Sequence, residues 1–220
     1  MEQISIVIPC YNEEKNIGKV IDRARKNNFS NPEIIVVDNN SQDKTSKISR
    51  NKGAIIVKEE KIGKGRAMRR GAMKARGEIL VFIDGDNSYS AEFIGKIIDP
   101  LIKKESNIVY GSRFLKSSKI KISTLRLIGN NFFSFLGNLL YGKKADFLSG
   151  FFAIKKDNFF ELNLKSNGFE VETEIFTKGA NKDFNIGQVP IIYTANQTSR
   201  INPFIDGIKI FYTLFKNKLC

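Results

Sequence analysis

The chain contains no histidine among its 220 residues, and it has only two cysteines. Histidine is the most common general base and a frequent zinc ligand, so its absence excludes Ser-His-Asp and Cys-His catalysis and the usual zinc sites. Carboxylates must therefore carry any acid–base or metal chemistry. Cys10 and Cys220 lie near opposite ends of the chain, which excludes a disulfide framework and fits a reducing compartment such as the cytosol.

Long uninterrupted apolar runs are also missing. The N-terminal MEQISIVIPC has no basic lead and no long apolar stretch, so we expect no signal peptide. The longest candidate for membrane contact, residues 125–141, is interrupted by Arg126 and three asparagines and is too short to span a bilayer. We therefore expect a cytoplasmic protein that lies peripherally on the cytoplasmic face of a membrane.

Acidic residues are in the minority. The chain has 36 Lys and Arg against 23 Asp and Glu, which gives a net charge of +13. This surplus indicates an anionic partner, which nucleic acid, acidic lipid or a phosphorylated substrate would satisfy equally well. The basic residues are dispersed and form no recognised nucleic-acid-binding motif, so we expect no nucleic acid as partner.

The first half of the chain alternates short apolar runs with segments of helical period. This pattern is typical of an α/β fold with a mostly parallel central sheet flanked by helices. A chain of 220 residues is long enough for one such domain. The predicted strands are residues 4–9, 33–37, 54–58, 79–83 and 107–110, and the predicted helices are residues 13–28 and 91–104, the latter with Phe93, Ile94, Ile97, Ile98, Leu101 and Ile102 facing inward.

The second half is less regular. We predict an amphipathic segment at 125–141, a strand at 151–154, a helix at 171–180, a strand at 185–190 and a basic amphipathic tail at 203–219. Apolar faces flanked by lysines are typical of segments that lie on an anionic membrane surface. Residues 125–141 fit an ordinary core helix about as well, whereas the tail favours the membrane.

Two acidic residues give the strongest chemical signal. In VFIDGDNSY a hydrophobic strand ends at Asp84 and Asp86, which Gly85 separates. Ligands of open α/β sheets bind at the carboxyl ends of strands, and two carboxylates at that place can hold one hard cation against substrate phosphates. An acidic turn that merely ends a strand is the alternative.

Three further segments lie where a nucleotide would bind in such a sheet. IVIPCYNEE places Tyr11 and Glu13 after the first strand, and IIVVDNNSQDKTS places Asp38 after the second. KIGKGRAMRRG places Lys64 at the start of a helix, as a neighbour of donor phosphates. Helix caps and turns are the plain alternatives, with Asn12 as a helix cap and a capped helix starting at Ser41.

Together these segments resemble glycosyltransferase family 2, which has the A-type glycosyltransferase fold. The resemblance covers residues 4 to about 113. It implies that Pro9, Tyr11, Glu13, Asp38, Lys64, Asp84 and Gly85 bind a nucleotide-sugar, and that Asp84 and Asp86 hold Mg²⁺ or Mn²⁺. At Asn39 and Asn40 the sequence departs from the more common Asp-Gly of the family.

The second half resembles the polyprenyl-phosphate and dolichyl-phosphate sugar synthases of this family. The resemblance lies in GSRF at 111–114, DFLSGFFAIKK at 146–156, GFEVETEI at 168–175 and VPIIY leading to Arg200. It implies that Ser88 replaces a third metal ligand and that Asp86 acts in catalysis together with phosphate-binding arginines, namely Arg113, Arg126 and Arg200.

The reaction implied is an inverting transfer of a sugar from a GDP- or UDP-linked donor to a polyprenyl or dolichyl phosphate. A phosphate monoester is already an anionic nucleophile, so it needs positioning by arginine and no histidine base. The alternative is a saccharide or other hydroxyl acceptor, for which Asp146 or Glu172 is available as base. We predict a donor half at 1–113, an acceptor half at 114–202 and a tail at 203–220.

Overall fold

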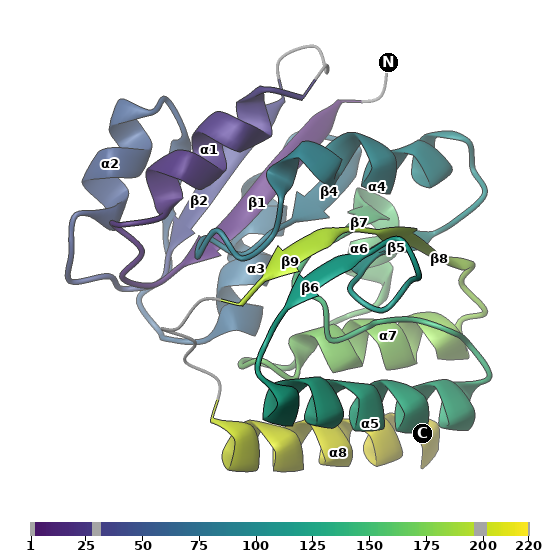
Figure 1. The fold of residues 1–220 in the computed structure, drawn as a ribbon. Coiled ribbons are helices and arrows are strands. Elements are labelled where there is room, and N and C mark those ends of the chain that lie inside the picture. The colour runs from purple at the N-terminus through teal and green to yellow at the C-terminus, as the bar shows by residue number, and fades with distance from the viewer. Residues whose placement is uncertain (1–2, 28–31, 196–201, 220) are drawn as a thin grey trace.

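The computed structural model describes residues 3–27, 32–195 and 202–219. A seven-stranded sheet runs through the centre, in the order β3-β2-β1-β4-β7-β5-β8 (Figure 1). Its strands are β1 (Ile4–Cys10), β2 (Glu33–Asp38), β3 (Ile55–Lys58), β4 (Ile79–Phe82), β5 (Ile108–Ser112), β7 (Phe152–Lys155) and β8 (Ile186–Pro190). The predicted α/β fold with a mostly parallel sheet is therefore confirmed.

One strand runs against the others. β7 pairs antiparallel with both β4 and β5, and the remaining pairs in this sheet are parallel. Phe152, at the start of β7, pairs with Phe82, at the end of β4. The chain just before β7 therefore lies beside the loop that follows β4, which is where the two predicted metal ligands stand.

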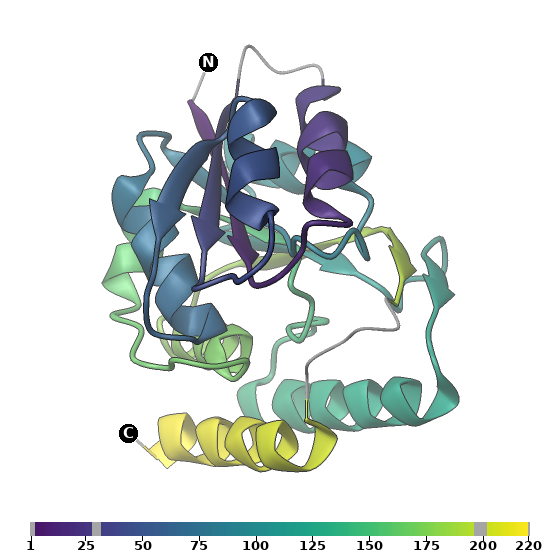
Figure 2. The ribbon, with the colours of Figure 1, turned by 90° about the vertical axis from the view of Figure 1, so that its left-hand side faces the viewer.

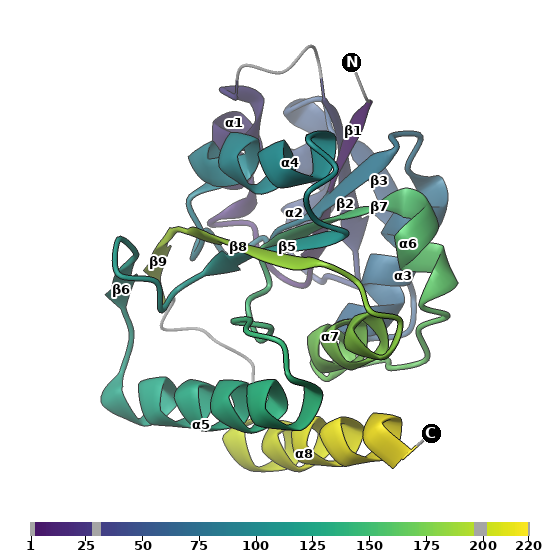
Figure 3. The ribbon, with the colours of Figure 1, turned by 90° about the vertical axis from the view of Figure 1, so that its right-hand side faces the viewer.

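Helices cover both faces of the sheet (Figures 1 and 3). One face packs against α1 (Ile17–Arg25), α2 (Thr45–Asn51) and α4 (Ile94–Ile102), with the 3-10 turn Ala91–Phe93 before α4. The other packs against α3 (Lys64–Lys74), α6 (Lys156–Glu161) and α7 (Val171–Asn181). Each face has its own apolar core because the central strands are rich in Ile and Val on both sides.

The two longest helices of the described chain form a separate layer. α5 (Thr124–Tyr141) and α8 (Pro203–Leu219) lie side by side at one end of the molecule, below α7 (Figures 1, 2 and 3). Leu214 of α8 is fully buried, and Tyr141 of α5 donates its hydroxyl to the Leu214 carbonyl at 2.7 Å. These contacts join both helices to the core on the α7 side.

A small second sheet was not predicted from the sequence. β6 (Lys119–Lys121) pairs in parallel with β9 (Ile192–Thr194), and Tyr193 also forms a bridge with Tyr89. Both strands are three residues long, and such short segments carry no readable periodicity.

Two details of the predicted helices were wrong. The helix expected at 13–28 begins at Ile17 and ends at Arg25, because Asn12 has a positive φ of 53° and residues 13–16 form a turn first. Asn16, not Asn12, is its N-cap residue, and residue 28 lies outside the described chain. Ile102, expected to face inward, is 48% exposed because it is the last residue of α4.

Candidate active site

The loops that follow β1, β2 and β4 lie together at the carboxyl ends of these strands, which we call the sheet edge. The parallel register pairs Cys10 with Asp38, and Val7 with Phe82. β1 and β2 therefore end together, β4 ends three residues earlier in this register, and all three carboxyl ends point the same way, as the sequence predicted. The residues expected to bind the nucleotide and the metal follow directly after these strand ends.

The loops after β1 and β2 are fastened to each other by hydrogen bonds. The Asn12 backbone N–H donates to Ser41 Oγ at 3.0 Å, and the Gln42 N–H donates to Asn12 Oδ1 at 2.7 Å. The Glu13 N–H donates to Thr45 Oγ1 at 2.7 Å. These polar residues therefore hold the shape of this edge, a role that the sequence alone did not reveal.

Asp38 and Asn39 stabilise the loop after β2 and the start of α3. Asp38 accepts hydrogen bonds from the Ser41 N–H at 2.8 Å and from the Ser46 hydroxyl, so both of its oxygens have partners within the chain. Asn39 is buried and accepts from the Gly63 N–H at 2.7 Å. Asn39 thereby positions the start of α3, while a contact between Asp38 and a nucleotide stays a prediction.

The Asp84–Ser88 loop is shaped by a close approach to β1. A Cβ on Gly85 would collide with Cys10 Sγ, so only glycine fits between the two aspartates. Asp86 Oδ1 accepts a hydrogen bond from the Ser88 N–H at 2.9 Å, and Ser88 itself is buried. Asp84 and Asp86 are both partly exposed at the sheet edge, and the ligand role predicted for Ser88 stays a prediction.

Lys64 joins three elements at this edge. Its Nζ lies 2.6 Å from Asp84 Oδ1 and 2.6 Å from Glu172 Oε1, so α3, the loop after β4 and α7 meet at one ammonium group. Burial raises the pKa of Asp84 and of Glu172, and the Lys64 charge opposes that rise. Burial alone would lower the pKa of Lys64, but the two carboxylates raise it well above its ordinary value, so Lys64 remains a cation.

Gly150 and Tyr89 complete the surroundings of Asp84. A Cβ on Gly150 would collide with Asp84 Oδ2, so the backbone before β7 packs directly on this carboxylate. The Gly150 N–H donates to the Tyr89 hydroxyl at 2.9 Å. The sequence carried a signal for both residues, because they lie inside the DFLSGF and DGDNSY segments, but spacing alone gave no reason to bring them together.

Arg113 and Asp146 form a buried ion pair beside this group. Arg113 donates from its backbone N–H and Nε to Asp146 Oδ2, at 2.8 and 2.9 Å, and from Nη2 to Oδ1 at 2.6 Å. Tyr193 and Phe114 each lie 5.4 Å from the guanidinium. Arg113 and Asp146 are both at most 4% exposed, so Asp146 holds Arg113 in place.

One carboxylate oxygen of the buried Glu172 lacks a hydrogen-bond partner in the described chain. Glu172 is 4% exposed, and Oε2 has no hydrogen-bond partner in the described chain. Buried carboxylate oxygens normally have partners, so an unpaired one beside a sheet-edge site indicates a ligand group or water. Of the two bases considered from the sequence, Glu172 has a free oxygen and Asp146 has none.

The donor set at this edge suits a hard divalent cation. Mg²⁺ and Mn²⁺ bind through one or two carboxylates and complete their shell with substrate oxygens and water. Asp84 and Asp86 supply that number, and no cluster of three or more His, Cys, Asp or Glu ligands occurs among residues 3–27, 32–195 and 202–219. The residues present therefore fit a cation that is held jointly with a bound phosphate.

Two predicted arginines cannot be placed. Arg200 lies outside the described residues, and Arg126 belongs to α5 but its side chain is not among those described. Tyr11, Glu13 and Pro9 are half-buried at the sheet edge. Their predicted contacts with a nucleotide stay predictions.

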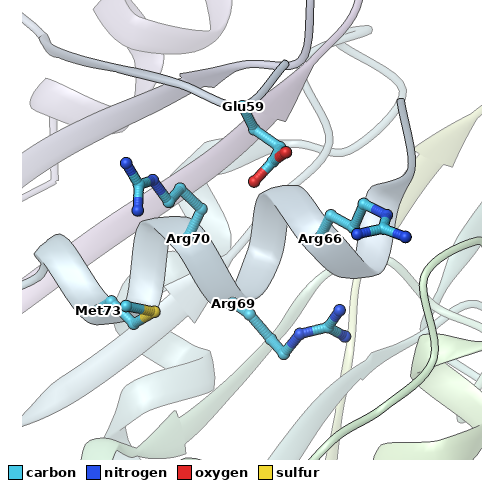
Figure 4. A pocket seen from close by; sticks show the side chains of 5 residues that line it. All are labelled: Glu59, Arg66, Arg69, Arg70 and Met73. Carbon is cyan, nitrogen blue, oxygen red and sulfur yellow. The ribbon is translucent and has the colours of Figure 1, made fainter. Parts of the chain in front are cut away.

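A basic pocket lies apart from these carboxylates, on the outer side of α3 (Figure 4). Arg66, Arg69 and Arg70 line it together with Glu59 and Met73. Arg69 donates to the Ser166 carbonyl and, at 2.8 Å, to Asn167 Oδ1. Arg69 therefore fastens α3 to the chain before α7, and neither Asp84 nor Asp86 belongs to this pocket.

Comparison with known proteins identifies the family. Residues 5–162 match the family described as glycosyl transferase family 2. The chain belongs to this family. The glycosyltransferase resemblance read from the sequence is therefore confirmed, and the chain is a glycosyltransferase with an A-type fold.

Three proteins are similar to this chain over nearly its whole length. A UDP-N-acetylglucosamine–dolichyl-phosphate N-acetylglucosaminyltransferase of Methanococcus voltae is 32% identical over 98% of this chain and 96% of its own length. A dolichyl-phosphate hexose transferase of Haloferax volcanii is 28% identical over 98% and 93%. Glucosyl-3-phosphoglycerate synthase of Mycobacterium tuberculosis, crystallised with Mn²⁺, UDP-glucose and glycerol 3-phosphate, aligns with a TM-score of 0.78 at 25% identity over 98% and 80%.

Proposed function

We propose that this glycosyltransferase moves a sugar from a GDP- or UDP-linked donor to a polyprenyl or dolichyl phosphate, with inversion and with the help of Mg²⁺ or Mn²⁺. The observation that carries the proposal is the near full-length similarity to two transferases named for dolichyl phosphate. The buried Arg113 supports it, because a guanidinium fixed by Asp146 suits a phosphate acceptor.

Each group at the sheet edge has a task in this proposal. Asp84 and Asp86 hold the cation, which would stabilise the charge that develops on the departing nucleoside diphosphate. Lys64 neutralises phosphate oxygens, and Arg113, aided by the predicted Arg126 and Arg200, positions the acceptor phosphate. No general base is needed because that phosphate is already ionised at neutral pH.

A hydroxyl acceptor is the second candidate, and one observation favours it. Glu172 is buried, and its Oε2 has no partner in the described chain, so it is placed to accept a proton from an alcohol. The alignment with an enzyme crystallised with glycerol 3-phosphate fits a small acceptor of this kind. Offering the enzyme a polyprenyl phosphate and, separately, the matching polyprenol separates the two candidates.

Metal dependence is the first test of the proposal. We expect sugar transfer to stop in excess EDTA and to return with Mn²⁺ or Mg²⁺, and we expect Asp86→Asn to lower turnover at least about a thousandfold while folding normally. A nucleotide-sugar panel with polyprenyl phosphate in detergent measures both effects. Full activity of Asp86→Asn, or full activity in EDTA, would show that this site does not work through a metal.

The layer formed by α5 and α8 supports a membrane-bound acceptor. Ten of the sixteen large hydrophobic residues exposed in the described chain lie on these two helices. They are Ile128, Phe132, Phe135 and Leu139 of α5, and Phe204, Ile205, Ile208, Phe211, Tyr212 and Phe215 of α8. We call this set the α5–α8 face.

The charges of α8 agree with docking on an anionic lipid surface. At 100° per residue, the exposed apolar row of α8 lies opposite its buried row, with Lys209 and Lys216 on one flank and Lys218 on the other. Asp206 is the only acidic residue of the two helices, and it is buried. Among the described residues no helix is long and apolar enough to cross a bilayer. We therefore propose that the α5–α8 face rests on an anionic membrane that supplies the lipid phosphate.

A further inference from the structure

Lys64 holds the carboxylate that the proposed metal needs. Its ammonium lies 2.6 Å from Asp84 Oδ1, and the backbone of Gly150 packs against the other oxygen, Oδ2. Both oxygens of Asp84 therefore have close neighbours within the chain, while the side chain remains 27% exposed. A cation held by Asp84 would compete with the Lys64 ammonium for the same carboxylate, and the two positive charges would repel each other in this mostly buried place.

The second carboxylate gives Lys64 a place to remain. Glu172 Oε1 lies 2.6 Å from the same Nζ, and the side chain of Glu172 is only 5% exposed. Glu172 Oε2 is unpaired in the described chain, so Glu172 can accept more of the ammonium hydrogens when Asp84 releases them. The aromatic ring of Phe169 lies 5.7 Å from Nζ and also attracts a cation.

We propose that Lys64 is a tethered cation that closes the metal site until the nucleotide-sugar arrives. In the donor-free protein, the Lys64 ammonium pairs with Asp84 in place of a metal ion and lowers the affinity of the site for Mg²⁺ or Mn²⁺. With the donor bound, Lys64 leaves Asp84, stays held by Glu172 and contacts the donor diphosphate. Metal and donor then bind with positive coupling, and this coupling depends on Lys64. The inference rests on the proposed role of Asp84 and Asp86 as metal ligands.

The coupling predicts opposite effects of one substitution. Lys64→Met removes the competing charge, so Mn²⁺ should bind the donor-free protein about tenfold more tightly or better. The same variant loses a phosphate contact, so UDP or GDP in the presence of Mn²⁺ should bind about tenfold more weakly or worse. A residue that only supports the shape of the site would weaken both affinities when it is replaced.

The test measures Mn²⁺ binding by the loss of the free-ion electron paramagnetic resonance signal, and nucleotide binding by calorimetry. Lys61→Met is the matched control, because it removes the same charge from an exposed side chain in the loop before α3 and should change neither affinity. Lys64→Met leaves Asp84 and Glu172 without their cation, so thermal unfolding of each variant is recorded. Should Lys64→Met fail to fold, the comparison is made between Glu172→Gln and the double variant Lys64→Met, Glu172→Gln.

The outcomes separate the two proposals. Tighter Mn²⁺ binding without nucleotide and weaker nucleotide binding in the Lys64→Met protein, or tighter Mn²⁺ binding by the double variant than by Glu172→Gln, supports the tethered cation. Unchanged or weaker Mn²⁺ binding after Lys64 is replaced, in either background, overturns the tethered cation. If the wild-type protein still binds Mn²⁺ in the presence of nucleotide, the proposed metal site is retained. No Mn²⁺ binding to the wild-type protein, even with UDP or GDP, overturns both.

Discussion

At the scale of residues, the site is organised by buried charges that neutralise one another. Arg113 and Asp146 are at most 4% exposed and share three hydrogen bonds. Removing one partner of such a pair leaves a buried charge without compensation. Asp146 was considered from the sequence as a possible base, but its oxygens are taken up by Arg113, so we infer that it is a positioning residue.

This role predicts both a stability effect and an activity effect for Asp146. Asp146→Ala should lower the free energy of unfolding by about 3–5 kcal/mol, measured by urea denaturation. Asp99→Ala, which breaks the exposed pair with Lys103, should have a much smaller effect on stability and is the control. Asp146→Asn should reduce turnover while the pH profile of the remaining activity keeps its shape. Loss of the acidic limb of that profile would instead identify Asp146 as the base.

At the scale of elements, α3 depends on a close approach to the sheet. A Cβ on Gly71 would collide with Val7 Cγ1 and come within 2.8 Å of Val37 Cγ2. Alanine is favoured over glycine inside a helix by about 1 kcal/mol, but overpacking costs about 1–3 kcal/mol, so the clash should prevail. Gly71→Ala is therefore expected to lower the free energy of unfolding.

Gly129 in α5 provides the matched comparison. Nothing lies within 4 Å of a Cβ built there, so Gly129→Ala should raise the free energy of unfolding by about 0.5–1 kcal/mol. Urea denaturation of the two alanine variants measures both signs. A Gly71→Ala protein as stable as the wild type would mean that α3 moves away from the sheet without loss.

The sequence predicted the elements whose apolar period is strong and missed those fixed by polar contacts. The five strands of the first half, the helices at 91–104 and 171–180 and the amphipathic tail at 203–219 correspond to elements of the structure, with ends shifted by a few residues. β6 and β9 are three residues long and depend on each other. The antiparallel insertion of β7, which brings Gly150 onto Asp84, is a long-range pairing that no local pattern encodes.

The same limit applies to the site. Asp84 and Asp86 were predicted as metal ligands from the sequence because they follow a strand directly, and this role stays a prediction. The Lys64–Glu172 contact was not predicted, because it joins residues more than a hundred positions apart. The bonds of Asn12 with Ser41 and Gln42 were also missed, because residues of this kind are equally typical of helix caps and turns.

At the scale of the whole molecule, the exposed apolar residues are concentrated at one end, on the α5–α8 face. We expect the wild-type protein to co-sediment with vesicles that contain anionic lipid, and to do so less at high salt because part of the attraction is electrostatic. Replacing Phe132, Phe135 and Phe211 by Ser should weaken this binding about tenfold or more.

Phe160→Ser is the matched control for vesicle binding. Phe160 is 46% exposed, close to the 47% of Phe211, but it lies on α6, away from the α5–α8 layer. Equal binding by the triple variant and the wild type would remove the membrane from the proposal. A concentration-dependent dimer that the triple variant no longer forms, seen by gel filtration without lipid, would assign the α5–α8 face to a second copy of the chain.

The most direct test of the central claim compares two lipid acceptors that differ only in the phosphate. Labelled sugar from the best nucleotide-sugar donor is offered to a polyprenyl phosphate and to the matching polyprenol, with Mn²⁺ or Mg²⁺, and the organic extract is counted. We predict a lipid-linked product with the phosphate and none with the alcohol. Equal transfer to the polyprenol, or no lipid-linked product with the phosphate, would contradict the claim that this glycosyltransferase acts on a lipid phosphate.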